Sequence, residues 1–155
     1  MSLSLAILED EDDRRRAMAD CFQDRFPQYP IRFFATAAEM IWYLQRHRSE
    51  LIAIALDHDL ELVPITDREN LDSGTGRNVA DFLATVAPTC PVVIHTTNEH
   101  AGFAMEETLR QAGWPTSRVV PYGDLEWISE VWFRVIRDAI VAYVATESHA
   151  VATTK

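Results

Sequence analysis

Short apolar runs alternate along the chain with segments whose apolar residues repeat at helical spacing. Five runs have the length and composition of strands: Leu3–Leu8, Ile31–Phe34, Leu51–Leu56, Pro91–His95 and Arg118–Val120. Strands alternating with helices are typical of βα units, whose strands are parallel. The pattern therefore predicts an α/β fold with a five-stranded parallel sheet, doubly wound as (βα)5, with helices on both faces in a three-layer sandwich.

The segments between the strands carry start and stop signals of helices. We expect helices over Asp13–Phe26, from Ala37 to about His47, from near Gly76 to Val86, from Asn98 to Gly113, and from Leu125 to about Thr146. The second begins with a capping box, Thr36 to Glu39, and the fourth pairs an Asn N-cap with a Gly at its end. We predict one domain over residues 1–146 and a disordered tail over 147–155.

Composition narrows the class of partner. The chain has 155 residues, 48% of them hydrophobic, and a net charge of −10, so it suits one domain and disfavours direct DNA binding, which needs clustered Lys and Arg. Two isolated cysteines and the lack of a long apolar run predict a cytoplasmic protein with no membrane segment. The broad apolar stripe of the last predicted helix favours the core, while a homodimer stays open.

Polar side chains gather where three of the predicted strands end. Glu9 and Asp10 follow the first strand, Asp57 follows the third, and His95-Thr96-Thr97-Asn98 closes the fourth. Because the carboxyl ends of parallel strands converge on one crevice, these side chains are expected to meet. Crowded carboxylates repel one another unless a cation joins them, and an all-oxygen set suits Mg²⁺.

The predicted metal ligands are therefore Glu9, Asp10, Asp57 and Asp59. The acidic run at Glu9 is also explained as the first turn of a helix, where the dipole favours negative charge. Asp57 favours the metal site, because it is the first polar residue after six apolar ones and emerges at the crevice. Asp59 is placed as a second ligand or a base, with a turn or cap as its structural alternative.

Chemistry at the crevice is assigned to four residues. Asp57 is the candidate nucleophile toward a phosphoryl group, and Thr96 is placed to donate a hydrogen bond to a phosphoryl oxygen. His58 and His95 are candidate acid/base groups, with an ordinary hydrogen-bonding role as the equal alternative. Together with Asp57 and Thr96 they form the predicted catalytic set.

Two further segments border this crevice. Thr97 and Asn98 are candidate ligand contacts at a helix start that favours anions, although capping explains them equally well. Residues 57–76 show no clear period, and a loop of that length is typically functional or disordered. We expect it to act as a lid, with Arg68 or Arg77 as a cation for phosphate or, more simply, as a solvated charge.

The order of acidic pair, strand-end Asp and strand-end Thr in five βα units resembles the receiver domain of bacterial response regulators, a flavodoxin-like fold, over about Leu5–Tyr143. By this resemblance Glu9 and Asp10 match the metal-binding pair, Asp57 the phosphoacceptor and Thr96 the switch hydroxyl. Val120 stands at the position of the family's Lys, and Ser117 at that of its aromatic switch residue. The resemblance implies Mg²⁺ and a phosphodonor, either a histidine kinase or a small phosphodonor, with a protein partner downstream.

A closer likeness is to the divergent receiver-like group described as cyclic-phosphate-processing. It is carried by Asp57-His58-Asp59-Leu60, Thr75-Gly76, and His95-Thr96-Thr97-Asn98 followed by Met105. That likeness implies Mg²⁺ and phosphoryl chemistry.

Three functions fit these observations. The first is a stand-alone receiver in two-component-type signalling, with Asp57 as phosphoacceptor. The second is a metal-dependent hydrolase of cyclic or terminal phosphate esters that uses His58 or His95, motivated by the missing Lys and the extra histidines. The third is a pseudo-receiver that only binds proteins.

Overall fold

Five parallel strands form the sheet of this chain in a computed structural model, which describes residues 2–61, 63–64 and 70–153. The strands are β1 (Ser4–Leu8), β2 (Ile31–Phe34), β3 (Leu51–Asp57), β6 (Val92–His95) and β7 (Thr116–Val119). They lie in the order β2-β1-β3-β6-β7, and every neighbouring pair is parallel. The predicted five-stranded parallel sheet is confirmed.

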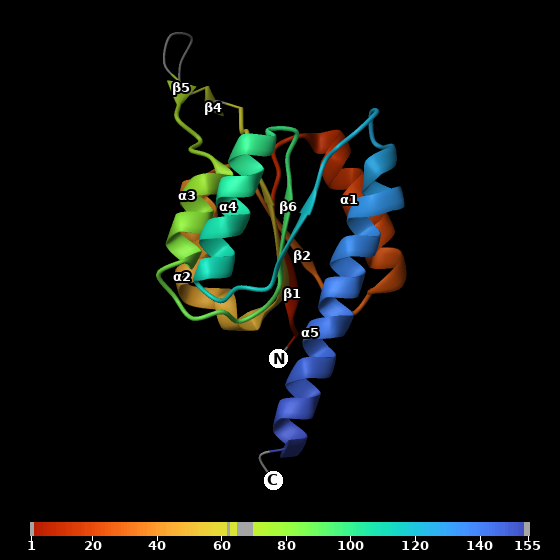
Figure 1. The fold of residues 1–155 in the computed structure, drawn as a ribbon. Helices are drawn as coiled ribbons and strands as arrows, with labels where there is room; N and C mark the ends of the chain where they lie inside the picture. The colour runs from red at the N-terminus through yellow and green to blue at the C-terminus, as the bar shows by residue number, and fades with distance from the viewer. Residues whose placement is uncertain (1, 62, 65–69, 154–155) are drawn as a thin grey trace.

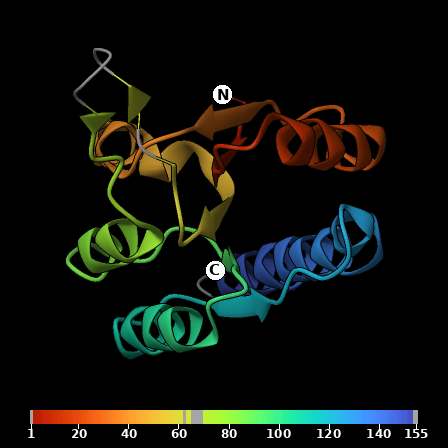
Figure 2. The ribbon, with the colours of Figure 1, turned by 90° about the horizontal axis from the view of Figure 1, so that it is seen from above.

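Helices cover both faces of this sheet (Figures 1 and 2). They are α1 (Asp12–Arg25), α2 (Ala37–His47), α3 (Gly76–Leu83), α4 (Glu99–Gln111) and α5 (Phe133–Thr153), with a short 3-10 helix η1 (Arg48–Glu50) and a π-helical turn η2 (Ile128–Trp132) before α5. Helices α2, α3 and α4 lie on one face, and α1 and α5 lie on the other (Figure 2). This is the predicted doubly wound, three-layer arrangement.

Local signals in the sequence account for several helix ends. The Thr36 hydroxyl accepts from the Glu39 amide at 3.2 Å, and the Asn98 side chain accepts from the Ala101 amide at 3.0 Å. Both residues satisfy a backbone donor that the first helical turn leaves free. Gly113 follows α4 with φ of +90°, a left-handed conformation that favours glycine.

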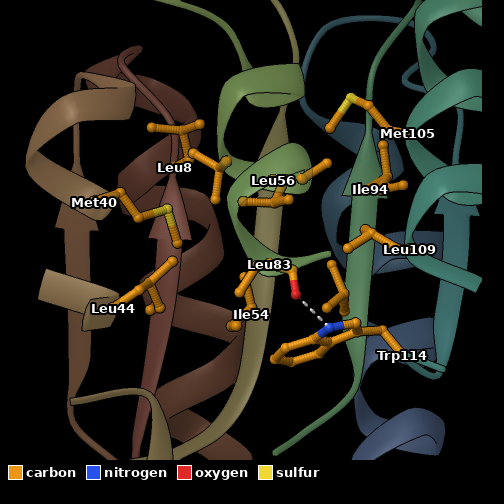
Figure 3. Close-up of a cluster of buried hydrophobic side chains, with 14 of the residues drawn as sticks. Leu8, Met40, Leu44, Ile54, Leu56, Leu83, Ile94, Met105, Leu109 and Trp114 are labelled. Atoms are coloured by element: carbon orange, nitrogen blue, oxygen red, sulfur yellow. Dashed lines mark hydrogen bonds between the residues drawn. The ribbon is translucent and has the colours of Figure 1, made fainter. Parts of the chain in front are cut away.

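The sheet separates two hydrophobic cores. The first core lies under α2, α3 and α4 and includes Met40, Leu56, Leu83, Ile94 and Trp114 (Figure 3). Its indole is satisfied, since Trp114 Nε1 donates to the Leu83 carbonyl at 2.9 Å. The second core lies under α1 and α5, where bulky aromatic side chains fill the space between helices and sheet. It includes Ile7, Phe22, Ala55, Val93, Trp127 and Trp132.

The last helix extends further than the sequence indicated. We expected it to end near Thr146 and to be followed by a disordered tail, but α5 continues to Thr153. No Gly or Pro interrupts residues 147–153, so the backbone hydrogen bonding of the helix can continue through them. Figure 1 shows the end of α5 extending below the body of the domain.

Part of the predicted loop at 57–76 forms an antiparallel pair of short strands, β4 (Val63–Pro64) and β5 (Asn70–Leu71). The pair lies beyond the carboxyl end of the sheet, on the side of α2 and α3 (Figures 1 and 2). Arg68, one of the two cations proposed for this loop, lies outside the described residues. Among the helices described, none has both the length and the apolarity needed to cross a bilayer.

Candidate functional site

The register of three neighbouring strands places a row of ionisable side chains at the carboxyl end of the sheet. Leu8 of β1 pairs with Leu56 of β3, and Asp57 pairs with His95 of β6, so Glu9, Asp57 and His95 lie side by side. Side chains two residues apart on a strand share a face. The residues two positions earlier, Ile7, Ala55 and Val93, belong to the second core, and the ionisable row therefore caps that core.

This row is buried and closely spaced. Glu9 and His95 are completely buried and Asp57 is 5% exposed. Their ligand atoms lie within 4.8 Å of one another, and His95 Nε2 is 3.2 Å from Glu9 Oε1. The centroids of the His95 and Trp127 rings lie 5.7 Å apart. His95 Nδ1 has no hydrogen-bond partner among the described residues.

The two carboxylates of the row differ in their pKa values. Burial alone would raise the pKa of Glu9, but the hydrogen bond and charge of His95, the Glu11 amide and Arg14 together lower it to about 2. Burial raises the pKa of Asp57 to about 7, because the nearby His95, Arg14 and the His58 amide only partly offset the lost solvation and the repulsion from Glu9. One carboxylate is thus stabilised as an anion, whereas the other is poorly compensated.

A cavity of roughly 290 Å³ opens above Asp57. Its lining is mostly acidic and combines the ends of β1, β3 and β6 with the first turn of α1. The lining residues are Asp10, Glu11, Arg14, Asp57, Asp59, Leu60, Glu61, Thr96 and Thr97. The predicted convergence of Asp10, Asp57, Asp59, Thr96 and Thr97 on one crevice is therefore found in the structure.

Glu9 and His95 take a different place from the one expected. Both were predicted to act at the crevice, but they are fully buried and do not line the cavity. They contact each other beside Asp57 instead. Their position follows from strand alternation, which directs Glu9 into the second core while Asp10 reaches the cavity.

The backbone around Asp57 is held by close contacts with the start of α3. The His58 amide donates to Asp57 Oδ1 at 2.7 Å, and the Gly76 amide donates to the His58 carbonyl at 3.0 Å. A Cβ at Gly76 would lie only 2.0 Å from the Asp57 carbonyl oxygen. Glycine at this position lets α3 approach the end of β3.

His58 and Asp59 form a pair at the edge of the cavity. His58 Nδ1 lies 2.9 Å from Asp59 Oδ1, and the Asp59 side chain is 65% exposed. The Asp59 carboxylate thereby orients the His58 ring. The contact places both residues next to Asp57, as their positions in the sequence implied.

The segment after β3 is tied to the acidic pair of β1. Asp10 Oδ2 accepts from the Glu61 amide at 2.6 Å, and the Ser73 hydroxyl donates to the Glu61 carbonyl. These bonds hold Glu61, which lines the cavity, to Asp10 and to Ser73. Arg77 instead pairs with Asp81 on α3 at 2.9 Å, in agreement with the simpler interpretation of that residue.

Thr96, Thr97 and Asn98 divide their roles at the start of α4. Thr96 is 6% exposed, lines the cavity, and its hydroxyl accepts from the Asn98 amide at 3.1 Å. Thr97 is exposed and lines the cavity. Asn98 caps α4, because its side chain accepts from the Ala101 amide. The capping role expected for Asn98 is therefore present, and its contact with a ligand stays a prediction.

Arg14 and Trp127 belong to the site although the sequence did not single them out. Arg14 Nη1 lies 3.4 Å from Glu9 Oε1 and 3.8 Å from Asp57 Oδ2, and Arg14 Nε lies 2.8 Å from Glu11 Oε2. Its guanidinium carbon stands 5.3 Å from the centre of the Trp127 ring. The chain has three consecutive arginines at 14–16, and only the phase of α1 against the sheet distinguishes Arg14 from its neighbours.

The end of β7 contributes no cation to the cavity. Val120, at the position where the resemblance places a Lys, is 47% exposed and does not line the cavity. Both departures noted in the sequence, Val120 and Ser117, lie on or beside β7. The cation nearest Asp57 in the described structure comes from α1.

Several solved structures with a similar fold are receiver or response regulator domains. They include the response regulator domain of Thermotoga maritima CheB, with a TM-score of 0.63, 13% identity and coverage of 90% of this chain and 97% of that chain. The phosphorylated cyanobacterial phytochrome response regulator RcpA matches with a TM-score of 0.63, 16% identity and coverage of 89% and 91%. The signal receiver domain of a LuxO repressor protein from Vibrio parahaemolyticus matches with a TM-score of 0.59, 16% identity and coverage of 94% and 98%. The fold is therefore that of a receiver domain.

The family follows from the sequence itself. The model of the cyclic-phosphate processing receiver domain matches residues 7–111, which span all of the acidic, Asp57 and Thr96 positions discussed above. This chain belongs to that family, as its motifs indicated. Among curated proteins, none matches this chain.

Proposed function

We propose that this chain is a phosphoryl-accepting receiver in which Asp57 takes the phosphoryl group. The observation that carries the proposal is the position of Asp57. It ends the central strand, it is nearly buried, and it lines a cavity together with Asp10 and Thr96. A phosphoacceptor needs a carboxylate that faces a space for phosphate and is flanked by groups able to bind the phosphoryl oxygens.

The residues present fit a bound Mg²⁺. Asp10 and Asp57 supply carboxylate oxygens to the cavity wall, and Mg²⁺ needs one or two such ligands together with water and phosphate oxygens. The raised pKa of Asp57 is the expected signature of a buried carboxylate that lacks a full counter-charge. When bound, Mg²⁺ supplies positive charge to the phosphoryl oxygens. Asp59 is placed as a further, outer ligand. Glu9 stays a candidate ligand, because its carboxylate oxygen lies within 4.8 Å of the ligand atoms of Asp57 and His95.

The transfer step is a displacement at phosphorus. An Asp57 carboxylate oxygen attacks the phosphorus of a phosphodonor such as acetyl phosphate, and the bond from phosphorus to the acetate oxygen breaks. Acetate leaves with the bonding electron pair, and Asp57 becomes an acyl phosphate. Thr96 donates its hydroxyl hydrogen to a phosphoryl oxygen, while the His58 amide holds the other Asp57 oxygen in place.

Intact-mass measurement tests this proposal. The chain is incubated with Mg²⁺ and acetyl phosphate, and we expect one added phosphoryl group that disappears in Asp57→Asn and in EDTA. Asp20→Asn is the matched control, because Asp20 is an exposed carboxylate on α1. An unmodified wild-type chain, or equal modification of Asp57→Asn, would contradict the proposal.

A second function is favoured by the pair of His58 and Asp59. Their 2.9 Å contact leaves an imidazole beside the cavity, where it can serve as acid or base in opening a cyclic phosphate ester. The family description names cyclic-phosphate processing. Water would attack phosphorus, the ring P–O bond would break, and the departing alkoxide oxygen would take a proton to leave a phosphomonoester.

Turnover of 2′,3′-cyclic nucleotides and RNA ends with cyclic phosphate tests this second function. We expect Mg²⁺-dependent opening that falls in His58→Gln but not in His100→Gln, a change at an exposed histidine on α4. Inactivity of the wild-type chain on the whole panel, with Mg²⁺ binding intact, would exclude it.

A further inference from the structure

The cavity wall carries a strong excess of negative charge. Among the described residues that line it, five are acidic, namely Asp10, Glu11, Asp57, Asp59 and Glu61, and Arg14 is the one cation. A phosphoryl group on Asp57 would add about two further negative charges. Without a cation from the protein, the carboxylates of the pocket would repel the phosphoryl group.

Arg14 reaches this pocket from the first turn of α1. Its Nη1 is shared between Glu9 Oε1 at 3.4 Å and Asp57 Oδ2 at 3.8 Å, and its side chain is 23% exposed. Glu11 holds the Nε side of the guanidinium at 2.8 Å, and Trp127 supports its face. These contacts leave the guanidinium oriented between the helix and Asp57, at the surface of the cavity.

We infer that Arg14 is the cation that binds the phosphoryl group on Asp57, in place of the lysine that Val120 replaces at the end of β7. The inference rests on the proposed function. A guanidinium presents several donors in a plane and pairs with two phosphate oxygens, so it suits this position better than a single ammonium group.

A purely structural ion pair does not account for the arrangement equally well. Structural pairing with Glu9 and Glu11 would not require the guanidinium to face Asp57 as well. The 3.8 Å separation from Asp57 is long for a hydrogen bond. A phosphoryl group on Asp57 would extend toward Arg14 and shorten that gap by presenting new oxygens.

Beryllofluoride, a mimic of the phosphoryl group, separates this role from metal binding. We would measure Mg²⁺ binding alone by intrinsic tryptophan fluorescence, and then beryllofluoride binding at saturating Mg²⁺ by fluorine NMR. The variants are Arg14→Gln, Arg14→Lys and the matched control Arg16→Gln, because Arg16 is exposed on the same helix.

We expect Arg14→Gln to bind beryllofluoride roughly tenfold to a hundredfold more weakly than wild type, as loss of a charge-assisted hydrogen bond implies. Its Mg²⁺ affinity should be unchanged or higher, because a competing cation is gone. Arg14→Lys should recover part of the affinity, and Arg16→Gln should match wild type.

Two results would overturn the inference. One is beryllofluoride binding in Arg14→Gln as tight as in wild type, and the other is a parallel loss of Mg²⁺ and beryllofluoride affinity together with stability. If the wild-type chain forms no Asp57-dependent adduct with either beryllofluoride or acetyl phosphate, the proposed function itself fails and this inference fails with it.

Discussion

The two faces of the sheet differ in the buried polar groups that they contain and in how well those groups are hydrogen-bonded. Under α2, α3 and α4 the first core is apolar, and its one buried indole, that of Trp114, is hydrogen-bonded. Under α1 and α5 the second core ends in the ionisable row of Glu9, Asp57 and His95. On that face the indole nitrogens of Trp127 and Trp132 and Nδ1 of His95 lack partners among the described residues.

This difference indicates which face of the sheet loses stability in order to hold the site. Buried polar atoms without partners, and a buried carboxylate with a raised pKa, reduce stability. Natural proteins tolerate such groups where binding or chemistry needs them. The first core thus serves stability, whereas the second sacrifices some stability to hold the site.

Substitution of the two buried carboxylates should give the largest effects, with opposite signs. In EDTA, the folded pKa of Asp57 (about 7) lies above its ordinary value of 3.8. Its stabilising contribution is present below about pH 4 and is lost as pH rises toward 7. Asp57→Asn should therefore be more stable than wild type at pH 8, by up to about 4 kcal/mol.

Glu9→Gln should do the reverse. The pKa of Glu9 is lowered from 4.5 to about 2, so its contribution is present above about pH 4.5 and is lost as pH falls toward 2. At pH 7 the variant should lose up to about 3 kcal/mol in urea unfolding. If both variants changed the unfolding free energy in the same direction, the two carboxylates would not differ as described.

Gly76→Ala tests whether α3, which covers the first core, also positions Asp57 at the site. The new Cβ would meet the Asp57 carbonyl oxygen at 2.0 Å, so α3 or the end of β3 must shift. We expect a loss of about 1–3 kcal/mol in unfolding free energy together with weaker beryllofluoride binding. Gly113→Ala is a control for destabilisation alone, since alanine is strained at the φ of +90° found there and its added Cβ would meet only Pro88, at 3.6 Å. Unchanged beryllofluoride affinity in Gly76→Ala would mean that α3 does not position Asp57.

Two tryptophan substitutions compare the cores directly. Trp114→Phe removes a satisfied indole from the first core, and Trp132→Phe removes one without a partner in the described structure from the second. Both leave a similar cavity, so the hydrogen bond should make Trp114→Phe more destabilising by about 1–2 kcal/mol. Chemical denaturation measures this difference, and equal losses would argue against distinct packing of the two faces.

Asn98→Ala should have the smallest effect. Loss of the cap on α4 should reduce the unfolding free energy by about 1 kcal/mol. If Asn98 only caps the helix, beryllofluoride affinity at saturating Mg²⁺ should stay at the wild-type value. A clear drop in that affinity would instead assign Asn98 to the ligand, and Thr36→Ala, the loss of the cap on α2, provides the control for capping alone.

The fold was predictable because its signals are local. The first four apolar runs, the Thr36 cap, the Asn98 cap and Gly113 act within a few residues of chain, and each was found where the sequence indicated. The last strand lies at Thr116–Val119 and not at the predicted Arg118–Val120. The convergence of Asp10, Asp57 and Thr96 was predictable for a different reason, since the carboxyl ends of parallel strands meet at one edge.

Tertiary structure alone decided which of these groups reach the cavity and what surrounds them. The sequence treats Glu9 and Asp10 alike, but strand register buries Glu9 against His95 and leaves Asp10 on the cavity wall. The three arginines of α1 are likewise equivalent until the helix packs on the sheet, when Arg14 alone comes to face Asp57. The sequence specifies which chemical groups are available by short-range rules, whereas their burial, pairing and pKa depend on long-range packing that no local pattern contains.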